Sequence, residues 1–455
     1  MTTVATIFPR AFAVCFSEIE RWDPASFHRI LWHWPSAVMR PLGSVLRMRK
    51  EKVDRSNVNF ADLQPITIHF DGSIDRRQVD AGREYSMDLF YARPGDIVVA
   101  KIDLKNGAVG LVPNDWHNVV VTGHFAVYEP DRSSLVAEYL CLLVQTSFFK
   151  AHLWRNKVGA EGRKEVKLDF FKAQRIPLPP LPVQRKIVAA WEAARKDAAS
   201  AAEKIAELER EIEAQFLADL GITPPLQCIG PKCLSVWWRN LERWDLAFAR
   251  RPPFNPNSKT YPNARLKDAV QPIRHTTRRV LPSMTPNEDF NYIGMENVES
   301  ITGRLVDFSS RKGSAIKSSC VAFDRNHILY GKLRPYLRKV VDCSELPMTE
   351  GIASSEFLPL RPSKNVTQSW LAFYLRSVAI AEQAKAAIGA RMPRIAPDAL
   401  LNFIIPIPPL SVQHEIMKRI SARRAEIAKM KREAKAALEA AKADVEAMIL
   451  GTKPV

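Results

Sequence analysis

The 455-residue sequence contains no long hydrophobic run. Its most apolar segment, residues 135–144, is short and contains Glu138, whereas a membrane-spanning helix needs about 18 or more consecutive apolar residues. Near the start of the chain, Arg10 precedes an apolar run at residues 11–16, which is shorter than the core of a secretory signal. We therefore expect a cytoplasmic protein that has no membrane partner.

Cysteine is scarce, with six residues at positions 15, 141, 228, 233, 320 and 343. They form no Cys-x-x-Cys pair and no regular framework, so reduced and mostly buried thiols are expected. Cys228 and Cys233 have no second ligand pair at a suitable spacing, which argues against a zinc site. We expect neither a metal nor a cofactor on this chain.

Motifs for catalysis are missing as well. The segment Arg251-Pro252-Pro253-Phe254 resembles the Asn/Asp-Pro-Pro-aromatic loop of amino-methyltransferases, but arginine cannot accept a hydrogen bond from a target amine. Gly331-Lys332 lacks the earlier glycine and the following Ser or Thr of a P-loop. Residues 161–167 imitate part of a nuclease site without an upstream aspartate in a strand. We therefore predict a chain that performs no chemistry itself.

Basic charge is what the sequence has in excess. Lysine and arginine number 66 against 49 aspartates and glutamates, which gives a formal net charge of +17. Such a balance favours a polyanionic partner, above all nucleic acid. Apolar residues make up 46% and charged residues 25%, a composition typical of folded domains. The length predicts two to four of them.

An internal repeat organises the chain. The tetrapeptide Glu-Arg-Trp-Asp at residues 20–23 recurs at residues 242–245, and IPLPPLPVQ at residues 176–184 recurs as IPIPPLSVQ at residues 405–413. Between them, matching segments keep a nearly constant offset. Lys101 and Lys332, for example, stand 231 positions apart (332 − 101 = 231). Nearly gapless agreement over that span predicts two copies of one fold.

Each copy is predicted to be a mixed domain followed by a long helix, which is an α+β fold class. In the first copy, β-rich runs bounded by turn residues predict strands at 66–70, 97–102 and 125–128, followed by a helix over 134–153. In the second copy the corresponding strands are 328–333 and 356–360, and the helix spans 367–388.

After each Pro-rich segment, a helix with a coiled-coil seam is predicted. Steps of 4 and 3 residues separate the seam positions of the first run, Ile187, Trp191, Ala194, Ala198, Ala201, Ile205, Leu208 and Ile212. The second run is looser, with Arg423 and Asp444 in seam positions beside Ile416, Ile420, Ile427, Met430, Ala434, Ala437 and Ala441. Gly221 and Gly451 end the helices. We predict an antiparallel pair with a mixed domain at each end.

At the paired IPLPPLPVQ and IPIPPLSVQ segments, each leading into a long helix, the chain resembles a specificity subunit of a type I restriction-modification system. The resemblance implies two target-recognition domains, each reading one half of a bipartite, asymmetric double-stranded DNA target. It also implies that the helices set the spacer and hold two methyltransferase subunits, and that a restriction and translocase subunit joins for cleavage. S-adenosylmethionine, ATP and Mg²⁺ would then belong to those partners.

The expected boundaries follow from the repeat and the resemblance. The first recognition domain is placed at residues 1–180, the first helix at 181–222, a linker at 223–240, the second recognition domain at 241–408 and the second helix at 409–451.

Basic residues in matching loops are the candidates for DNA contact, through phosphates or through guanine edges. They are Lys101, Arg163, Lys164 and Lys167 in the first copy, and Arg274, Arg278, Lys332, Arg334, Arg338, Arg391 and Arg394 in the second. Three alternatives stay open at this point. They are the specificity subunit of a type II methyltransferase-nuclease system, a coiled-coil scaffold or regulator, and an enzyme whose catalytic residues are scattered in the sequence.

Overall fold

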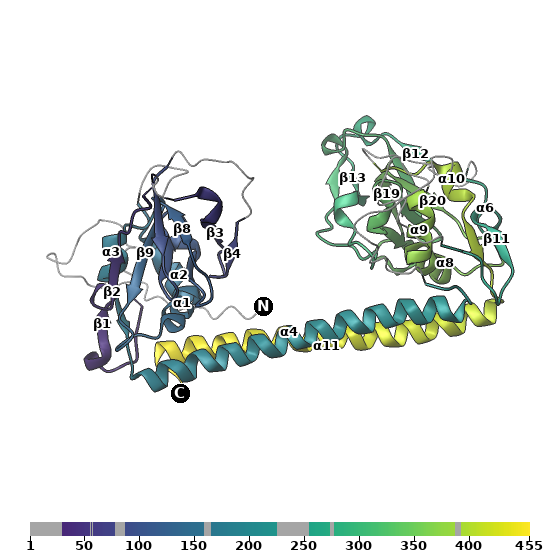
Figure 1. Ribbon diagram of the computed structural model, residues 1–455. Coiled ribbons are helices and arrows are strands. Elements are labelled where there is room, and N and C mark those ends of the chain that lie inside the picture. Colours follow the sequence, from purple (N-terminus) through teal and green to yellow (C-terminus); the bar gives the residue numbers. More distant parts are fainter. Residues whose placement is uncertain are drawn as a thin grey trace. The chain divides into compact units, whose positions relative to one another are not determined.

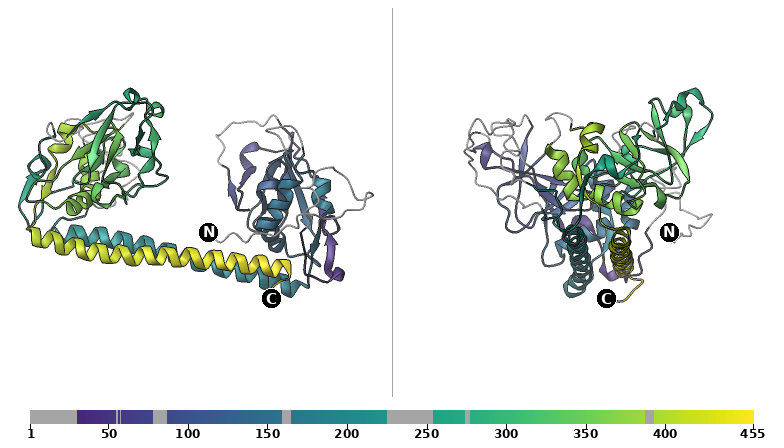
Figure 2. Two further views of the ribbon diagram at one scale, coloured as in Figure 1. Left: turned by 180° about the vertical axis from the view of Figure 1, so that it is seen from behind. Right: turned by 90° about the vertical axis from the view of Figure 1, so that its right-hand side faces the viewer.

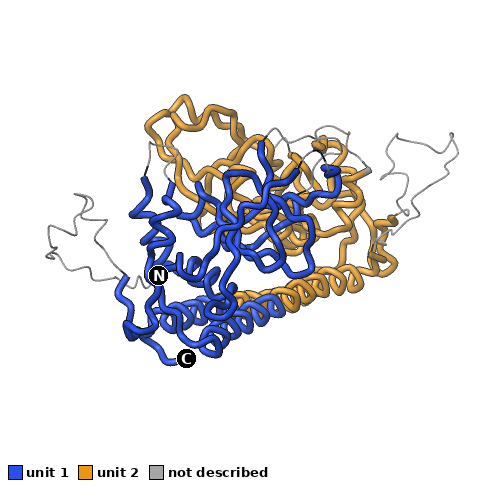
Figure 3. The backbone as a smooth tube through the Cα atoms, turned by 60° about the vertical axis from the view of Figure 1, so that its left-hand side comes forward, with its two compact units in different colours: residues 1–201, 432–455 blue, residues 202–431 orange. Residues whose placement is uncertain are grey.

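A computed structural model of the chain describes residues 30–54, 56, 58–77, 87–158, 165–224, 254–273, 277–386 and 393–455. The chain divides into two compact units, Met1–Ala201 with Arg432–Val455, and Ala202–Lys431 (Figure 3). The division passes through both long helices, so each unit contains one mixed domain and part of each helix. The repeated Glu-Arg-Trp-Asp motifs and most of the predicted linker lie outside the described residues.

The first domain is built on two four-stranded sheets (Figure 1). One has the order β2-β9-β6-β7, from strands Leu46–Arg49, Phe125–Pro130, Ile97–Ala100 and Val109–Leu111. The other has the order β4-β3-β8-β5, from strands Ile74–Arg76, Gln64–Ile68, Val119–Thr122 and Leu89–Ala92. A short pair, β1 (Met39–Pro41) with β10 (Arg175–Pro177), joins the beginning and the end of the domain. Helices α1 (Ala137–Gln145), α2 (Ser147–Arg155) and α3 (Leu168–Ala173) complete it.

The second domain repeats this plan. Its sheets have the orders β18-β17-β20 (Val340–Asp342, Ile328–Gly331, Phe357–Leu360) and β12-β16-β19-β14 (Arg279–Val280, Cys320–Asp324, Glu350–Ser354, Tyr292–Ile293). Short pairs are β13 (Asp289–Phe290) with β15 (Arg311–Lys312), and β11 (Asn263–Arg265) with β21 (Ile404–Pro406). The helices of this domain are α6 (Leu266–Ala269), α8 (Gln368–Arg376), α9 (Val378–Ala386) and α10 (Pro397–Leu401).

Strand registers confirm the predicted repeat. In the first domain Ala100 of β6 pairs with Phe125 of β9, and in the second Gly331 of β17 pairs with Phe357 of β20. Each domain also has one parallel strand pair among its described strands, β3 with β8 in the first domain and β14 with β19 in the second. A register shift of one residue would turn every side chain of a strand to the opposite face, so agreement at this level means that both copies bury the same face.

Each single helix predicted after the sheet is in fact two helices. Thr146 separates α1 from α2 with an extended backbone, and its hydroxyl both accepts from the backbone N–H of Phe149 and donates to the carbonyl of Leu143. Ser377 separates α8 from α9 with an equally extended backbone, ψ at 160°, although its hydroxyl has no hydrogen-bond partner among the described residues. Hydroxyl side chains compete with the helix for backbone partners. At Thr146 this local competition overrides the continuous apolar pattern that suggested one helix.

Two long helices, α4 (Leu181–Asp219) and α11 (Leu410–Leu450), follow the domains. In each unit their parts lie side by side (Figure 2). The contacts are antiparallel, because Ile187 packs in one core with Val445 and Ile449, while Ile205 and Ile212 pack in the other with Ile416, Ile420 and Ile427. This arrangement confirms the predicted fold class. Among the described residues, no helix is both long and hydrophobic enough to cross a membrane.

The seam of α11 differs from the prediction by one residue in two places. Arg423 and Asp444 are exposed, and the positions turned inward are Arg424 and Val445. The step after Ile420 is therefore four residues rather than three. In a straight α-helix, a seam with a strict seven-residue period rotates slowly around the helix, and an additional step of four brings the seam back to the neighbouring helix. As a result, an arginine stands on the inner face of α11 in the second unit.

A buried glutamine connects each domain to the helix that follows it. Gln184, fully buried, accepts from the backbone N–H of Val136 at 2.9 Å and donates to the carbonyls of Ser134 and Pro179 at 2.9 and 2.8 Å. Gln413, equally buried, accepts from the backbone N–H of Thr367 at 2.8 Å and donates to Asn365 and Pro408 at 3.0 and 2.8 Å. The last residue of each Pro-rich motif thus fixes the start of α1 or α8 to the start of the long helix.

A glutamate from the other long helix provides a second attachment. In the first unit, Glu446 of α11 accepts from the backbone N–H and the hydroxyl of Ser147, both at 2.6 Å, at the start of α2. In the second unit, Glu213 of α4 accepts from the backbone N–H of Val378 at 2.6 Å, at the start of α9. A carboxylate at a helix N-terminus satisfies unpaired N–H groups and opposes the positive end of the helix dipole. Each domain is therefore held by the beginning of one long helix and by the end of the other.

Candidate nucleic-acid interface

Three predicted cations of the second domain are brought together by two segments far apart in the sequence. The backbone N–H of Arg334 donates to Pro393 O at 2.6 Å, and that of Ile395 donates to Lys332 O at 3.0 Å. A β-bridge also pairs Leu333 with Arg394. Lys332, Arg334 and Arg394 therefore lie on one paired segment just beyond the end of β17.

These cations are close enough to affect one another's ionisation. Burial lowers the pKa of Lys332 from its usual value, and the positive charges of Arg394 and Arg279 lower it further, while Glu356 opposes the shift. Glu356 forms an ion pair with Arg394, and its second oxygen is buried without a hydrogen-bond partner among the described residues. We call Arg279, Lys332, Arg334 and Arg394 the basic cluster. With Glu356 as the neighbouring carboxylate, it has an excess of positive charge.

Arg338 lies apart from the basic cluster. It ends the short helix η11 (Pro335–Leu337) in the left-handed conformation, with φ at +52°. Its guanidinium forms an ion pair with Glu213 of α4, and only 15% of its side chain is exposed. The matching residue of the first domain is Gly107, with φ at +91° after helix η6 (Leu104–Asn106). The strained backbone of Arg338 places its side chain against the long helix.

In the first domain, Lys101 occupies the position that matches Lys332. Its backbone N–H donates to His124 O at 3.0 Å, as that of Lys332 donates to Glu356 O at 2.9 Å. Its Nζ donates to Gly123 O at 2.6 Å. The other two N–H groups of the Lys101 ammonium can still donate hydrogen bonds to an acceptor. The loop that carries Lys101 is therefore built like its counterpart but has different side chains around it.

The remaining candidates are scattered. Lys167 stands at the start of α3 with 65% of its side chain exposed and forms an ion pair with Glu165 at 3.2 Å. Arg278 is exposed beside β12 and lines a pocket that also contains Glu288, Asp289, Asp324 and Glu350, so it faces carboxylates. Arg163, Lys164, Arg274 and Arg391 lie outside the described residues. For all these residues, DNA contact stays a prediction.

Sequence reasoning missed Glu356 as a member of this surface. The matching residue of the first copy is His124, so the repeat offered no signal for a carboxylate there. Across the part of the chain that the structure describes, no group of three or more His, Cys, Asp or Glu side chains is arranged to hold a metal ion. The surface can bind an anion through its cations.

Comparison with known families decides the class of the chain. The model of the family described as "type I restriction modification DNA specificity domain" matches twice, over residues 43–210 and 265–440. The chain belongs to this family. The two matches coincide with the two copies found in the sequence, so we call the domains specificity domain 1 and specificity domain 2. The predicted family is confirmed.

Individual relatives are distant. The "Type I restriction enzyme EcoDI specificity subunit" of Escherichia coli is 27% identical over 129 residues, which is 28% of this chain and 28% of that subunit. A solved chain from a study of complex assembly and conformational transition of the type I restriction-modification system is 18% identical, with a TM-score of 0.51 over 89% of this chain and 97% of that one. The HsdS subunit of Thermoanaerobacter tengcongensis is 17% identical, with a TM-score of 0.42 over 91% and 97% of the two chains.

Specificity domains 1 and 2 share their scaffold and differ at the positions where DNA contact is predicted. The glutamine attachment, the sheet registers and the glutamate attachment recur in both. Among the described residues, Lys332 has Arg394 and Glu356 beside it, whereas Lys101 has His124 and Gly123; residues 159–164, which match the loop that carries Arg394, lie outside them. The family match favours the type I assignment over the type II and scaffold alternatives.

Proposed function

We propose that this chain is the DNA-recognition subunit of a type I restriction-modification assembly. Each specificity domain reads one half of a bipartite, asymmetric target, and the helices α4 and α11 set the spacer between the halves. The observation that carries the proposal is the family match over both copies, together with a basic cluster in specificity domain 2 that specificity domain 1 does not repeat residue for residue. One scaffold with two different surfaces suits a target with two different halves.

The basic cluster is the proposed contact surface of specificity domain 2. Arg334 is exposed, and Arg394 has 57% of its side chain exposed even though it pairs with Glu356. Arginine at such a position binds phosphate or the O6 and N7 atoms of guanine. We leave Arg338 out of the contact surface because Glu213 already holds its guanidinium. Lys101 takes the equivalent place in specificity domain 1.

Partner subunits supply the chemistry in this proposal. Two methyltransferase subunits bind along α4 and α11, and a restriction and translocase subunit joins the complex. S-adenosylmethionine, ATP and Mg²⁺ bind to those subunits, so the chain itself is non-catalytic. Exposed side chains line the middle of both long helices, around residues 192–200 and 431–440. These outer faces are accessible to a partner helix.

Methylation mapping tests the proposal in cells. We expect a split adenine motif to be methylated when this chain is produced with its methyltransferase and to lose methylation when the chain is deleted. A methylation pattern that does not change on deletion refutes the proposed function.

Binding measurements with the purified assembly test the basic cluster. The double variant K332Q/R334Q is compared with K317Q, which removes an exposed cation of the same domain. Each lost phosphate contact reduces the slope of log K against log salt by about 0.9, so the double variant should reduce it by up to about 1.8. Lost guanine contacts instead cost about 1–3 kcal/mol for the cognate half-site only. If the wild type, K332Q/R334Q and K317Q bind DNA identically, the basic cluster is not part of the interface.

A further inference from the structure

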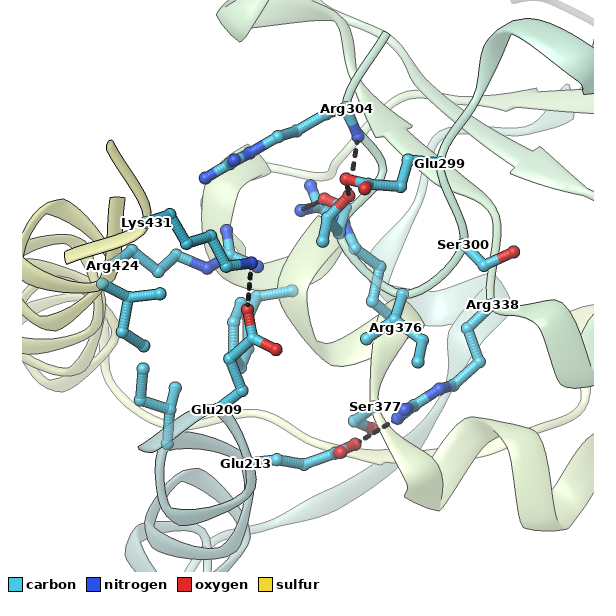
Figure 4. A pocket seen from close by; sticks show the side chains of 15 residues that line it. Glu209, Glu213, Glu299, Ser300, Arg304, Arg338, Arg376, Ser377, Arg424 and Lys431 are labelled. Carbon is cyan, nitrogen blue, oxygen red and sulfur yellow. Dashed lines mark hydrogen bonds and ion pairs between the residues drawn. The ribbon is translucent and has the colours of Figure 1, made fainter. Parts of the chain in front are cut away.

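The second unit contains a cavity of about 280 Å³ at the junction of specificity domain 2 with the long helices (Figure 4). Its walls come from α4, α11, the end of α8 and the loop at residues 299–304. Ile212, Phe373 and Ile427 form apolar parts of the lining. Five cations and three carboxylates also line it, namely Arg304, Arg338, Arg376, Arg424 and Lys431 with Glu209, Glu213 and Glu299.

Two ion pairs account for part of this charge. Arg338 pairs with Glu213, and Lys431 pairs with Glu209 at 2.8 Å. Glu299 accepts from the hydroxyl of Thr302. Among the described residues, neither Arg376 nor Arg424 has a carboxylate within ion-pair distance. The cavity therefore holds three guanidinium groups without an ion pair to any described residue, of which Arg304 is exposed, Arg424 half-buried and Arg376 buried.

Arg376 is the most deeply buried of the three, with 5% of the residue exposed. Its Nη1 donates to Thr302 O at 2.7 Å, and its Nε is buried with no hydrogen-bond partner among the described residues. The hydroxyl of Ser377, which also lines the cavity, is buried without a partner as well. Burial lowers the pKa of Arg376 to about 10, the charge of Arg424 adds to that effect, and the charges of Glu345 and Asp342 oppose it without an ion pair. A buried guanidinium that lacks an ion pair and keeps an N–H unsatisfied is costly, so this arrangement favours an anion beside it.

Arg424 reaches the cavity from α11 because it takes the inner seam position of that helix. Its guanidinium lies over the ring of Phe373, 4.8 Å from the centroid. Burial lowers its pKa, and the nearby charge of Glu345 opposes this without an ion pair. Two arginines and a hydroxyl thus face one partly apolar space, in which electrostatic attraction to an anion is stronger than in water.

Specificity domain 1 does not repeat this arrangement. Gln145, at the end of α1, takes the place of Arg376 and donates to the carbonyl of Gly107. A neutral side chain bonded within the domain needs no external partner. The buried Arg376 is therefore a property of the second copy and not of the scaffold, which tolerates glutamine at this position. Arg424 has a matching arginine in the first copy, Arg195, but that residue is exposed.

We propose that the cavity between specificity domain 2 and the long helices binds a small oxyanion, the phosphate or carboxylate group of a small molecule, through Arg376, Arg424 and Ser377. Guanidinium groups bind both kinds of oxyanion in bidentate geometry. The site is separate from the proposed DNA-contacting cluster. An oxyanion there would link α8 to α11 and so fasten the domain to the helix pair.

Isothermal titration of the full-length chain with inorganic phosphate, at constant ionic strength, tests this proposal. We expect one saturable site in the wild type. The variants R376Q and R424Q should each raise the Kd about tenfold or more, because each removes a hydrogen bond to a charged group. R376Q reproduces the residue found in specificity domain 1, and R424Q provides a second test if the first variant is unstable. A parallel titration with acetate identifies whether the site prefers phosphate or carboxylate.

Two controls distinguish this site from the basic cluster. K317Q should bind phosphate like the wild type, and so should K332Q/R334Q. R376Q should bind DNA like the wild type, because Arg376 is not part of the basic cluster. The phosphate titration can therefore succeed even if the DNA-reading role proposed for the basic cluster is wrong. The proposal is overturned if the wild type binds neither phosphate nor acetate saturably, or if K332Q/R334Q abolishes binding while R376Q and R424Q retain it.

Discussion

Replacing Gln413 with leucine should detach specificity domain 2 from the start of α11. The substitution keeps a similar volume but removes the acceptor of the Thr367 N–H and the donor to the carbonyls of Asn365 and Pro408. The Pro408 bond is buried and the other two are partly buried. A buried polar group left without a partner costs about 1–3 kcal/mol, and water can replace part of the loss at the two partly buried groups. We expect a destabilisation of about 2–4 kcal/mol.

For a unit of this size, that loss corresponds to a fall in Tm of about 5–15 °C. Scanning calorimetry of the full chain measures it, and hydrogen exchange at the Thr367 amide localises it. The matched control is Gln215→Leu on α4, where the glutamine is exposed and bonds to Asp219. Gln184→Leu should have a similar effect on the first unit. If Gln413→Leu melts within about 2 °C of Gln215→Leu and the Thr367 amide stays protected, the anchoring role is refuted.

Three further predictions follow from the same contacts. Burial lowers the pKa of Lys332, so its charge is present below that pKa and is lost as pH rises through it. DNA affinity measured by fluorescence anisotropy should therefore begin to fall at a lower pH than the titration of an ordinary lysine would give, and Lys332→Arg should abolish this early fall. Glu446→Gln should destabilise the first unit by about 1–2 kcal/mol in calorimetry, because it removes a charge-assisted cap of α2. The control Glu439→Gln, at an exposed position of the same long helix, should leave the stability unchanged. Inserting one heptad into both α4 and α11 adds about 10 Å of helix, so the recognised spacer should lengthen by about 3 base pairs. Methylation mapping measures the spacer. An unchanged spacer contradicts the proposal that the helices set it.

Much of the architecture is predictable from the sequence because it depends on repetition and periodicity. The motifs ending in Gln184 and Gln413 located the two copies, and the steps of four and three residues located α4. Both signals are local in sequence. They report which face of an element is apolar, and that face is buried wherever the element packs.

The details of the site depend on contacts between distant residues. Glu213 and Glu446 cap helices that belong to domains they do not directly follow, so no spacing rule links them to Val378 or Ser147. The break at Thr146 was missed because apolar periodicity continues across it. The position of Arg424 was missed because a heptad was assumed where the helix takes a step of four. In each case a tertiary contact or a hydroxyl group determined the structure, and the local sequence pattern did not report it.

The composition of the first unit has a consequence for synthesis of the protein. Val445 and Ile449 belong to its core, and the Nε1 of Trp34 donates to Ile449 O at 2.8 Å. The ribosome makes these partners only after the whole of specificity domain 2. Specificity domain 1 therefore emerges long before its apolar support exists, and must wait with that surface uncovered, or shielded by a chaperone, until α11 has been made.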